Sequence, residues 1–334
     1  MGHPIRVSGI DLSAQVEQLR RHFPDIHRRV DLARVESWQS ELAKNGLGKD
    51  DFGAEEAGGR GGDYVRAQLQ NVGARAHGIR QLVDLIRRGR LGRQTIVDLL
   101  GGDGLVQRVC AMLGFTDVEV MTCDASPHMV ETAWRAGIPA LLQRAERQLF
   151  RSGSVDGVLL AYGTHHIPVD MRRLAAEEAY RVLRPGGTFV LHDFLTGSPT
   201  DIWFSMIVDP YSTTGHQYEH FTDDEIQEHL IKAGFESYQV REVNDPYMAT
   251  GRTREEAEIE LGKYLVNMYG LNRAREAFGD LRAFRWAADK AQSIFNYPDA
   301  NGTFKKSTME YLDDQGLWRF TIPRIALVGV GRKM

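Results

Sequence analysis

The stretch 95–124 constrains the fold more than any other part of the sequence. Residues 95–100 are a short apolar run (Thr-Ile-Val-Asp-Leu-Leu), typical of a strand buried in a parallel sheet, and the turn Gly101-Gly102-Asp103-Gly104 follows directly. The pattern then predicts a helix over 105–113 and a second strand that ends at Asp124. The stretch is therefore expected to form a β-α-β unit with a glycine turn after its first strand and a carboxylate at the end of its second.

A unit of this kind is suited to binding a nucleoside. Glycines let a ligand approach the backbone closely, and a carboxylate at the end of the second strand can accept hydrogen bonds from ribose hydroxyls. Dinucleotide enzymes have a third glycine in the pattern Gly-x-Gly-x-x-Gly, whereas Leu-Val-Gln-Arg follows Gly104 here. A nicotinamide-dependent oxidoreductase is thus disfavoured, although it stays an alternative.

The glycine turn resembles the first motif of the class I S-adenosylmethionine (SAM) methyltransferases, Asp-x-Gly-x-Gly-x-Gly. Asp98, Gly102 and Gly104 match it, and Leu100 takes the place of the first glycine. Further segments extend the resemblance over roughly residues 94–245: 124–133, 154–160 with the loop 162–168, 178–187, and 223–243. The resemblance implies an α/β fold with a Rossmann-like core, a seven-stranded and mostly parallel sheet, and SAM as the cofactor.

The resemblance also implies which residues contact SAM. Asp124 would hold the ribose, Gly102 and Gly104 would lie against the methionine end, and Asp98 would make the hydrogen bonds of the turn. The family's acid for the adenine amino group is missing, since Arg144 falls near its place, so the backbone of Ala145 or the carboxylate of Glu146 would substitute. The remaining expected contacts are Gly101, Ala125, Met129 and, from an N-terminal helix over 64–88, Tyr64 or Arg66.

The chain divides into four parts by pattern. Residues 1–93 predict an N-terminal helical cap that includes a glycine-rich candidate lid at 54–63, and residues 94–245 the SAM-binding core. Residues 246–318, with helical patterns over 254–268 and 273–295, predict a helical insertion that roofs the substrate pocket or forms a homodimer contact. Residues 319–334 predict the closing strand of the core.

Composition limits the classes of partner and compartment. The formal net charge is −4 with both signs interspersed, which argues against nucleic acid, since nucleic-acid-binding domains are normally strongly basic. The loop 161–168 also lacks the Asn/Asp-Pro-Pro-aromatic tetrad that holds a flipped base. No apolar run approaches 18 residues, the N-terminus shows no signal segment, and Cys110 and Cys123 form no disulfide or metal spacing. The sequence therefore predicts a cytoplasmic protein without a membrane partner.

Five histidines fall in three loops that leave the carboxyl edge of the predicted sheet, where ligands bind in open α/β sheets. They are His165, His166, His192, His216 and His220. One hypothesis makes His166 or His192 a general base for a phenol, hydroxyl or enol acceptor. A second hypothesis has His192, His216 and His220 bind zinc or iron, which would acidify an acceptor such as a 2-oxo acid.

The function expected from these features is SAM-dependent methylation of a small metabolite in natural-product metabolism. With histidine or metal assistance, the acceptor is expected to be an enolisable α-keto acid, methylated on carbon, or a phenol-type molecule. Methylation of oxygen or nitrogen by a histidine base without metal is one alternative. A non-catalytic SAM-binding protein is another, and it would need no histidine-rich pocket.

Overall fold

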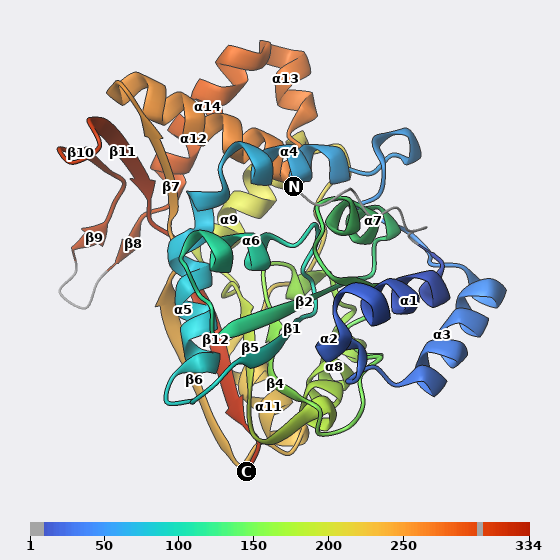
Figure 1. Cartoon of the computed structure of the whole chain (residues 1–334). Helices are drawn as coiled ribbons and strands as arrows, with labels where there is room; N and C mark the ends of the chain where they lie inside the picture. Colours follow the sequence, from blue (N-terminus) through green and yellow to red (C-terminus); the bar gives the residue numbers. More distant parts are fainter. Residues whose placement is uncertain (1–9, 299–302) are drawn as a thin grey trace.

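The computed structural model describes residues 10–298 and 303–334, so the predictions for 1–9 and 299–302 lie outside the described residues. Its centre is a seven-stranded sheet in the order β3-β2-β1-β4-β5-β12-β6 (Figure 1). All neighbouring strands are parallel except β12, which runs antiparallel to β5 and β6. The strands are β1 Gln94–Asp98, β2 Val118–Asp124, β3 Ala140–Leu142, β4 Val155–Leu160, β5 Leu183–Asp193, β6 Ser237–Asn244 and β12 Ile325–Arg332. The predicted Rossmann-like α/β core is confirmed.

The predicted β-α-β unit is present. Every residue of β1 is buried, as expected for a central parallel strand, and β1 pairs with β2 in register from Gln94↔Val118 to Asp98↔Thr122. The turn between β1 and helix α6 (Leu105–Met112) has positive φ at Gly102 and Gly104, a backbone conformation that glycine adopts without steric cost. The turn therefore exposes its backbone at the carboxyl end of β1.

Two hydrophobic layers enclose the sheet. Ile96, Leu159 and Val190 belong to one layer, together with α5 (Ala76–Arg87) and α6. Their neighbours along the strands, among them Val97, Val158 and Leu191, belong to the other, together with α8 (Val169–Val182) and α11 (Asp223–Lys232). This alternation follows from the two-residue repeat of a strand. Thr222 caps α11 by accepting a hydrogen bond from the Glu225 amide at 3.1 Å, as its sequence predicts.

The N-terminal segments cover the edge of the sheet at β3. Helices α1 (Leu12–His22), α2 (Pro24–His27) and α3 (Leu32–Asn45) precede the glycine-rich segment, and α7 (Pro127–Arg135) packs against β2 and β3. The side chains of Gln15 and Trp38 hydrogen bond to the backbone of Leu142 in β3. The helix predicted over 64–88 is divided into α4 (Gly61–Gln70), the 3₁₀ turn η2 (Val72–Arg75) and α5, because Asn71 has an extended backbone. The division places η2 beside the site described below.

The insertion contains more than helices. Helices α12 (Arg254–Tyr269), α13 (Asn272–Phe278) and α14 (Asp280–Ile294) lie at one end of the molecule, where α12 packs on α4 (Figure 1). Beside them, β7 (Tyr247–Gly251), β10 (Thr308–Leu312) and β11 (Leu317–Ile322) form a second sheet, and β8 (Tyr297–Pro298) pairs with β9 (Phe304–Lys305). In the part of the chain that the structure describes, no helix combines the length and apolar character needed to span a bilayer.

The predicted closing strand is wrong at its start. Residues 319–322 belong to β11 of the second sheet, and the core strand β12 begins only at Ile325. Pro323 separates the two strands, since a proline has no N–H to donate within a sheet. Arg324 then joins the core, where its amide carbonyl accepts a hydrogen bond from the Asp245 amide at 2.8 Å.

Candidate active site

A cavity of about 590 Å³ lies at the carboxyl ends of β1, β2 and β4. Six of the predicted SAM contacts line it: Tyr64, Gly102, Asp124, Ala125, Met129 and Ala145. His166, one of the two predicted bases, lines it as well. The residues in place of the family's adenine-binding acid, Arg144 and Glu146, also reach the wall. The structure thus brings these six residues together around one cavity, while Asp98, Gly101 and Gly104 lie outside its lining.

Asp124 is held by the turn that it faces. Its Oδ2 accepts a hydrogen bond from the Gly102 amide and its Oδ1 accepts one from the Ser126 amide, each at 2.9 Å. Burial raises the pKa of the Asp124 carboxyl to about 6, against the lowering by these amides. Each oxygen keeps a further lone pair, so the carboxylate can still accept hydrogen bonds from ribose hydroxyls.

Asp98, Gly101 and Gly104 do not line the cavity. The prediction that Asp98 makes the hydrogen bonds of the turn is not met, because the Gly102 amide donates to Asp124, and Asp98 Oδ2 is buried without a partner. Burial, then the nearby Asp124, raises the pKa of Asp98 to about 8. A Cβ on Gly101 would lie 2.9 Å from Asp98 Oδ2, and one on Gly104 would lie 2.7 Å from the Ile138 side chain. These residues shape the turn from behind.

Tyr64 lies against the glycine turn, as predicted, but Arg66 does not accompany it. The nearest Tyr64 ring atom would be 3.3 Å from a Cβ on Gly102. Arg66 pairs with Asp63 at 2.5 Å and its side chain is half exposed. Arg75 takes its place, because its Nη2 donates to the Tyr64 hydroxyl at 3.0 Å. Arg75 comes from η2, and no sequence pattern pointed to it.

A second and much smaller cavity adjoins the first. It measures about 20 Å³, room for roughly one water molecule, and its walls include Arg60, His165, Phe204 and Tyr269. Phe52, Tyr64, Tyr162 and His166 line both cavities. Because Met268 and Tyr269 of α12 also line it, the insertion forms part of its roof. This smaller cavity is called the acceptor pocket below.

Tyr162 connects the two cavities through an unusual backbone. Its φ of 63° is the only positive value at a residue other than glycine within residues 10–298 and 303–334. Non-glycine residues in this region are uncommon and concentrate at functional sites. The hydroxyl of Tyr162 donates to Asp245 Oδ1 at 3.1 Å. Tyr162 was expected to belong to the substrate-facing loop, but neither its backbone conformation nor its bond to Asp245 was foreseen.

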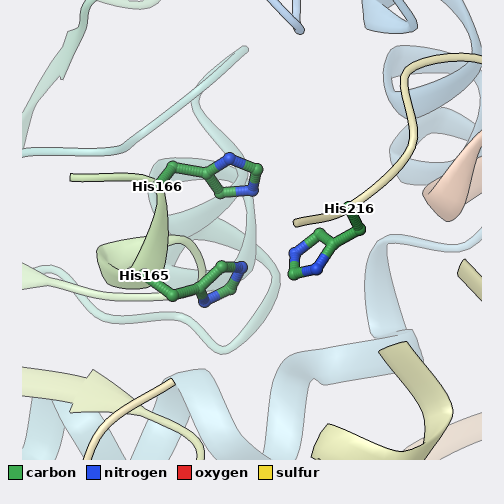
Figure 2. Close-up of side chains that lie close together, drawn as sticks. All are labelled: His165, His166 and His216. Carbon is green, nitrogen blue, oxygen red and sulfur yellow. The ribbon is translucent and has the colours of Figure 1, made fainter. Parts of the chain in front are cut away.

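Four histidines form a cluster beside the acceptor pocket. Ligand atoms of His165, His166 and His216 lie within 4.8 Å of one another, and so do those of His165, Asp193 and His220. His165 and His166 come from the turn after β4, and His216 faces them from the loop before α11 (Figure 2). The rings of His165 and His220 are 4.9 Å apart between centroids. The cluster has the residue types and spacing of a metal site.

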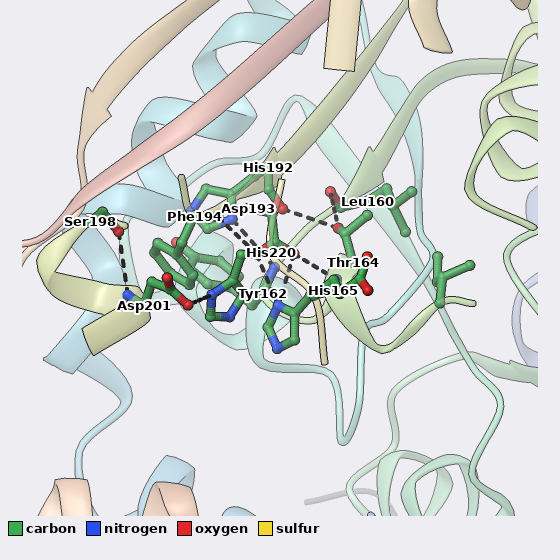
Figure 3. A network of polar contacts seen from close by, with 12 residues as sticks. Leu160, Tyr162, Thr164, His165, His192, Asp193, Phe194, Ser198, Asp201 and His220 are labelled. Atoms are coloured by element: carbon green, nitrogen blue, oxygen red, sulfur yellow. Dashed lines mark hydrogen bonds and ion pairs between the residues drawn. The ribbon is translucent and has the colours of Figure 1, made fainter. Parts of the chain in front are cut away.

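Carboxylates orient two of these histidines. Asp193 Oδ1 and Oδ2 both lie 2.9 Å from His165 Nδ1, and Asp201 Oδ1 lies 2.7 Å from His220 Nδ1 (Figure 3). Each carboxylate accepts the Nδ1 proton, which leaves Nε2 as a lone-pair donor. The Nε2 atoms of His165, His216 and His220 are buried and have no hydrogen-bond partner within the described residues.

Three of the four histidines are kept neutral by their surroundings. Burial, then the neighbouring His165 and His220, lowers the pKa of His216 to about 2. Burial also lowers the pKa of His220, and it lowers that of His166 well below the usual value. Neutral imidazole is the form that binds metals and accepts protons, so His166, His216 and His220 are suited to either task at neutral pH.

His192 is not part of this cluster, so the predicted set His192, His216 and His220 is not brought together. Its Nδ1 accepts a hydrogen bond from the Tyr162 amide at 3.4 Å (Figure 3). Its Nε2 lies 3.2 Å from Asp245 Oδ2. It is fully buried and lines neither cavity. Both ring nitrogens of His192 thus already have hydrogen-bond partners inside the protein, and the residue lies on β5 itself, whereas His165 lies in the turn after β4.

Comparisons with known proteins agree with this geometry. Residues 97–191 match a family model described as a methyltransferase domain. The chain is 28% identical to an arsenite methyltransferase of Halobacterium salinarum over 52% of its own length and 45% of the relative's. It is 31% identical to a ubiquinone/menaquinone biosynthesis C-methyltransferase of Methylobacterium nodulans over 34% and 47%. The chain thus spans about half the length of these relatives.

Solved structures give a weaker likeness. The YcgJ protein of Bacillus subtilis is 21% identical, with a TM-score of 0.45 over 76% of this chain and 98% of its own. The strand order, the glycine turn with Asp124 and the matching domain model are the stronger observations. Together they show that residues 97–191 form a methyltransferase domain of the class I SAM-dependent type.

Proposed function

We propose that the protein is a SAM-dependent methyltransferase that methylates carbon in a small enolisable molecule, with a divalent metal ion held by the histidine cluster. One observation supports this proposal above all others. His166 lines both the SAM cavity and the acceptor pocket, and it belongs to a group of metal-ligating atoms that includes buried histidine nitrogens without partners. A methyl donor and a metal-bound acceptor would therefore meet at one wall.

The residues of the larger cavity fit SAM. Asp124 would accept the ribose hydroxyls, Arg144 to Glu146 would surround the adenine, and Tyr64, whose hydroxyl Arg75 holds from behind, would face the methionine end. SAM supplies the methyl group on its sulfonium. The protein then has to hold the acceptor in line with that group and exclude water. Phe52 and Tyr218 close the same cavity, and the Tyr218 hydroxyl donates to Asp51 in the segment that carries Phe52.

The histidine cluster fits zinc or iron. The Nε2 atoms of His165, His216 and His220 lack hydrogen-bond partners among the described residues. Asp193 accepts a hydrogen bond from His165 Nδ1, as carboxylates do behind metal-binding imidazoles. We assign His165, His166 and His216 as ligands, with His220 and Asp193 beside them. A divalent ion there supplies positive charge that acidifies a C–H next to an acceptor carbonyl. His220 lies beside His165 and has a buried Nε2 without a hydrogen-bond partner, so it could accept the proton that the acceptor releases.

One of the two named relatives supports carbon as the methylated atom, whereas the other is named an arsenite methyltransferase. The ubiquinone/menaquinone protein is named a C-methyltransferase, which is consistent with an acceptor made acidic at carbon. Methylation of oxygen or nitrogen with His166 as the base is the second candidate, favoured by the lowered pKa of His166 and its place between the cavities. We assign the reaction to natural-product metabolism, as the sequence predicts, and a non-catalytic SAM-binding protein stays the least favoured alternative because such a protein needs no histidine cluster.

Labelled SAM and bound-metal analysis test this proposal together. Purified protein from cells grown with zinc and iron is expected to contain about one metal ion per chain. It is also expected to transfer label to a carbon atom of an enolisable molecule in a metabolite pool, as measured by mass spectrometry. His216→Asn should lower metal content and turnover while SAM affinity stays unchanged. His77→Asn, at an exposed position, is the matched control. Turnover that survives complete chelation would favour the metal-free candidate, and SAM binding without any turnover would favour the non-catalytic one.

A further inference from the structure

Arg60 is a buried cation in the wall of the acceptor pocket. Its side chain is 6% exposed, and its guanidinium carbon lies 4.2 Å from the centre of the Phe52 ring. Nη1 donates to the Met268 carbonyl at 2.8 Å. No carboxylate forms an ion pair with Arg60 among residues 10–298 and 303–334. A buried guanidinium without a counterion is costly, and native proteins normally pair such a charge.

Most of the other charges around the pocket are paired or neutral. Arg324 binds Asp245 at 2.5 Å, Asp193 is bound to His165, and Asp51 accepts a hydrogen bond from the Tyr218 hydroxyl. His166 and His216, whose pKa values Arg60 helps to lower, are neutral. Arg75 also lacks a carboxylate partner among the described residues, but its guanidinium donates to the Tyr64 hydroxyl beside the glycine turn. Arg60 is therefore the cation without a carboxylate partner that lies beside the histidines.

Arg60 is also fixed in place by the loop that carries it. The Arg60 amide donates to the Asp51 carbonyl at 2.9 Å, and the Gly61 amide donates to the Gly53 carbonyl at 3.0 Å. A Cβ on Gly61 would lie only 2.2 Å from the Phe52 carbonyl oxygen, so the loop 51–61 is folded tightly on itself. Because the acceptor pocket holds roughly one water molecule as it stands, side chains of its wall have to shift before an acceptor can enter. The tight loop keeps the Arg60 guanidinium at that wall.

We infer that the acceptor carries a carboxylate that Arg60 binds, and that it is a 2-oxo acid; this inference rests on the proposed function. With Nη1 engaged by Met268, the remaining N–H groups of the guanidinium offer the two parallel donors that match a planar carboxylate. His165 and His166 stand in the same pocket wall, so a carbonyl oxygen next to that carboxylate would face the histidine cluster. The C–H beyond the carbonyl is then the one made acidic.

Binding measurements with a charged probe and its neutral twin test this inference. The probes are phenylpyruvate, 2-oxobutanoate and 2-oxoglutarate, with phenylpyruvate methyl ester as the uncharged partner, titrated calorimetrically into metal-loaded protein saturated with S-adenosylhomocysteine. At least one 2-oxo acid should bind. The ester should bind about tenfold or more weakly than phenylpyruvate, because a charged hydrogen bond is lost.

Variants of Arg60 assign the carboxylate to its site. Arg60→Met should lower the affinity for the 2-oxo acid by about tenfold to about a hundredfold, and Arg60→Lys should lower it less. Metal content and the affinity for S-adenosylhomocysteine should equal those of the native protein in both variants. Arg66→Met, on the same helix but paired with Asp63, is the matched control and should change nothing. Thermal unfolding checks that both Arg60 variants fold, and Arg60→Lys keeps the test valid if Arg60→Met does not.

Three results would overturn the inference while the proposed function stands. The first is equal affinity of the ester and the acid, and the second is that Arg60→Met and Arg60→Lys both bind the acid as tightly as the native protein. The third is that no 2-oxo acid binds to protein that holds both metal and S-adenosylhomocysteine. Protein that binds neither metal nor S-adenosylhomocysteine would overturn the proposed function, and the inference with it.

Discussion

His165 and Asp193 form the most tightly defined pair in the site. Both carboxylate oxygens lie 2.9 Å from Nδ1 of the ring, and Asp193 Oδ2 also accepts the His165 amide at 2.7 Å. Although burial acts to raise it, the adjacent His165 lowers the pKa of Asp193 to about 2. Asp193 therefore stays ionised, fixes the tautomer of His165 and directs Nε2 into the cluster.

Asp193→Asn should weaken metal binding by about tenfold to about a hundredfold, since the amide supports the imidazole less well than a carboxylate does. Competition with a chromogenic chelator measures the affinity. SAM affinity is expected to be unchanged, because Asp193 does not line the larger cavity. Unaltered metal affinity in this variant would contradict the assignment of His165 as a ligand.

His192→Gln distinguishes the cluster seen in the structure from the metal set expected from the sequence. The variant should keep its metal, because His192 belongs to neither group of ligand atoms. It should lose about 1–3 kcal/mol of unfolding free energy, because the hydrogen bonds to Tyr162 and Asp245 are disturbed in a fully buried place. Urea unfolding with bound-metal analysis measures both. Loss of metal from a folded variant would restore His192 as a ligand.

Asp124→Asn should lower SAM affinity by about tenfold or more, since a carboxylate that accepts ribose hydroxyls is replaced by an amide with one acceptor oxygen. Isothermal calorimetry with SAM measures the change. Asp289→Asn, an exposed position on α14, is the control and should bind SAM as the native protein does. Equal affinity in the two variants would mean that the ribose lies elsewhere.

SAM affinity should fall as the pH is lowered through the Asp124 transition. Burial raises the pKa of this carboxyl to about 6 in the free protein, so it is ionised at pH 7 and increasingly protonated below pH 6. Since protonation removes an acceptor, the affinity should decrease by up to about tenfold per pH unit below the pKa. Calorimetry from about pH 5 to about pH 8 measures the profile, which should be flat in Asp124→Asn. A flat profile in the native protein would exclude Asp124 as the titrating group.

Gly101→Ala should damage the turn and weaken SAM binding. Its Cβ would lie 2.7 Å from Thr122 Cγ2 and 2.9 Å from Asp98 Oδ2, inside a packed strand pair, and such overpacking costs about 1–3 kcal/mol. Gly62→Ala is the matched control, because its Cβ meets nothing within 4 Å and alanine favours the helix α4. Thermal unfolding and SAM calorimetry should separate the two variants. Equal stability would show that the turn has room to relax.

Local sequence was sufficient for the core and for the SAM cavity. The apolar runs, the glycine turn and Asp124 are close in sequence, so their hydrophobic periodicity and spacing are enough to predict the β-α-β unit. The structure confirms this arrangement. The end of the insertion was harder, because the apolar pattern of 317–330 continues across Pro323 from one sheet into another. Only the pairing of β11 with β7, and of β12 with β5 and β6, separates the two strands.

The acceptor side depended on contacts between distant segments. The sequence predicted that His216 and His220 share a site with His192, whereas the structure groups them with His165. Which of two neighbouring strand ends faces a cavity is set by side-chain packing, and the sequence pattern does not show this. Arg60 and Arg75 left no signal of their own, since an arginine near a helix start is usually a solvated residue. Their burial results from the fold of α12 onto α4, across a wide separation in sequence.

The bonds between Asp245 and Arg324 join the two ends of the insertion to each other. These two residues lie at the two ends of the insertion and are joined by backbone and side-chain hydrogen bonds. The strands β6 and β12 therefore pair next to this junction as the two strands of a short hairpin would. A segment attached at so narrow a base can be exchanged between related proteins without disturbing the strands beneath. Changes in the insertion can therefore alter which acceptor is bound without altering the residues around the SAM cavity.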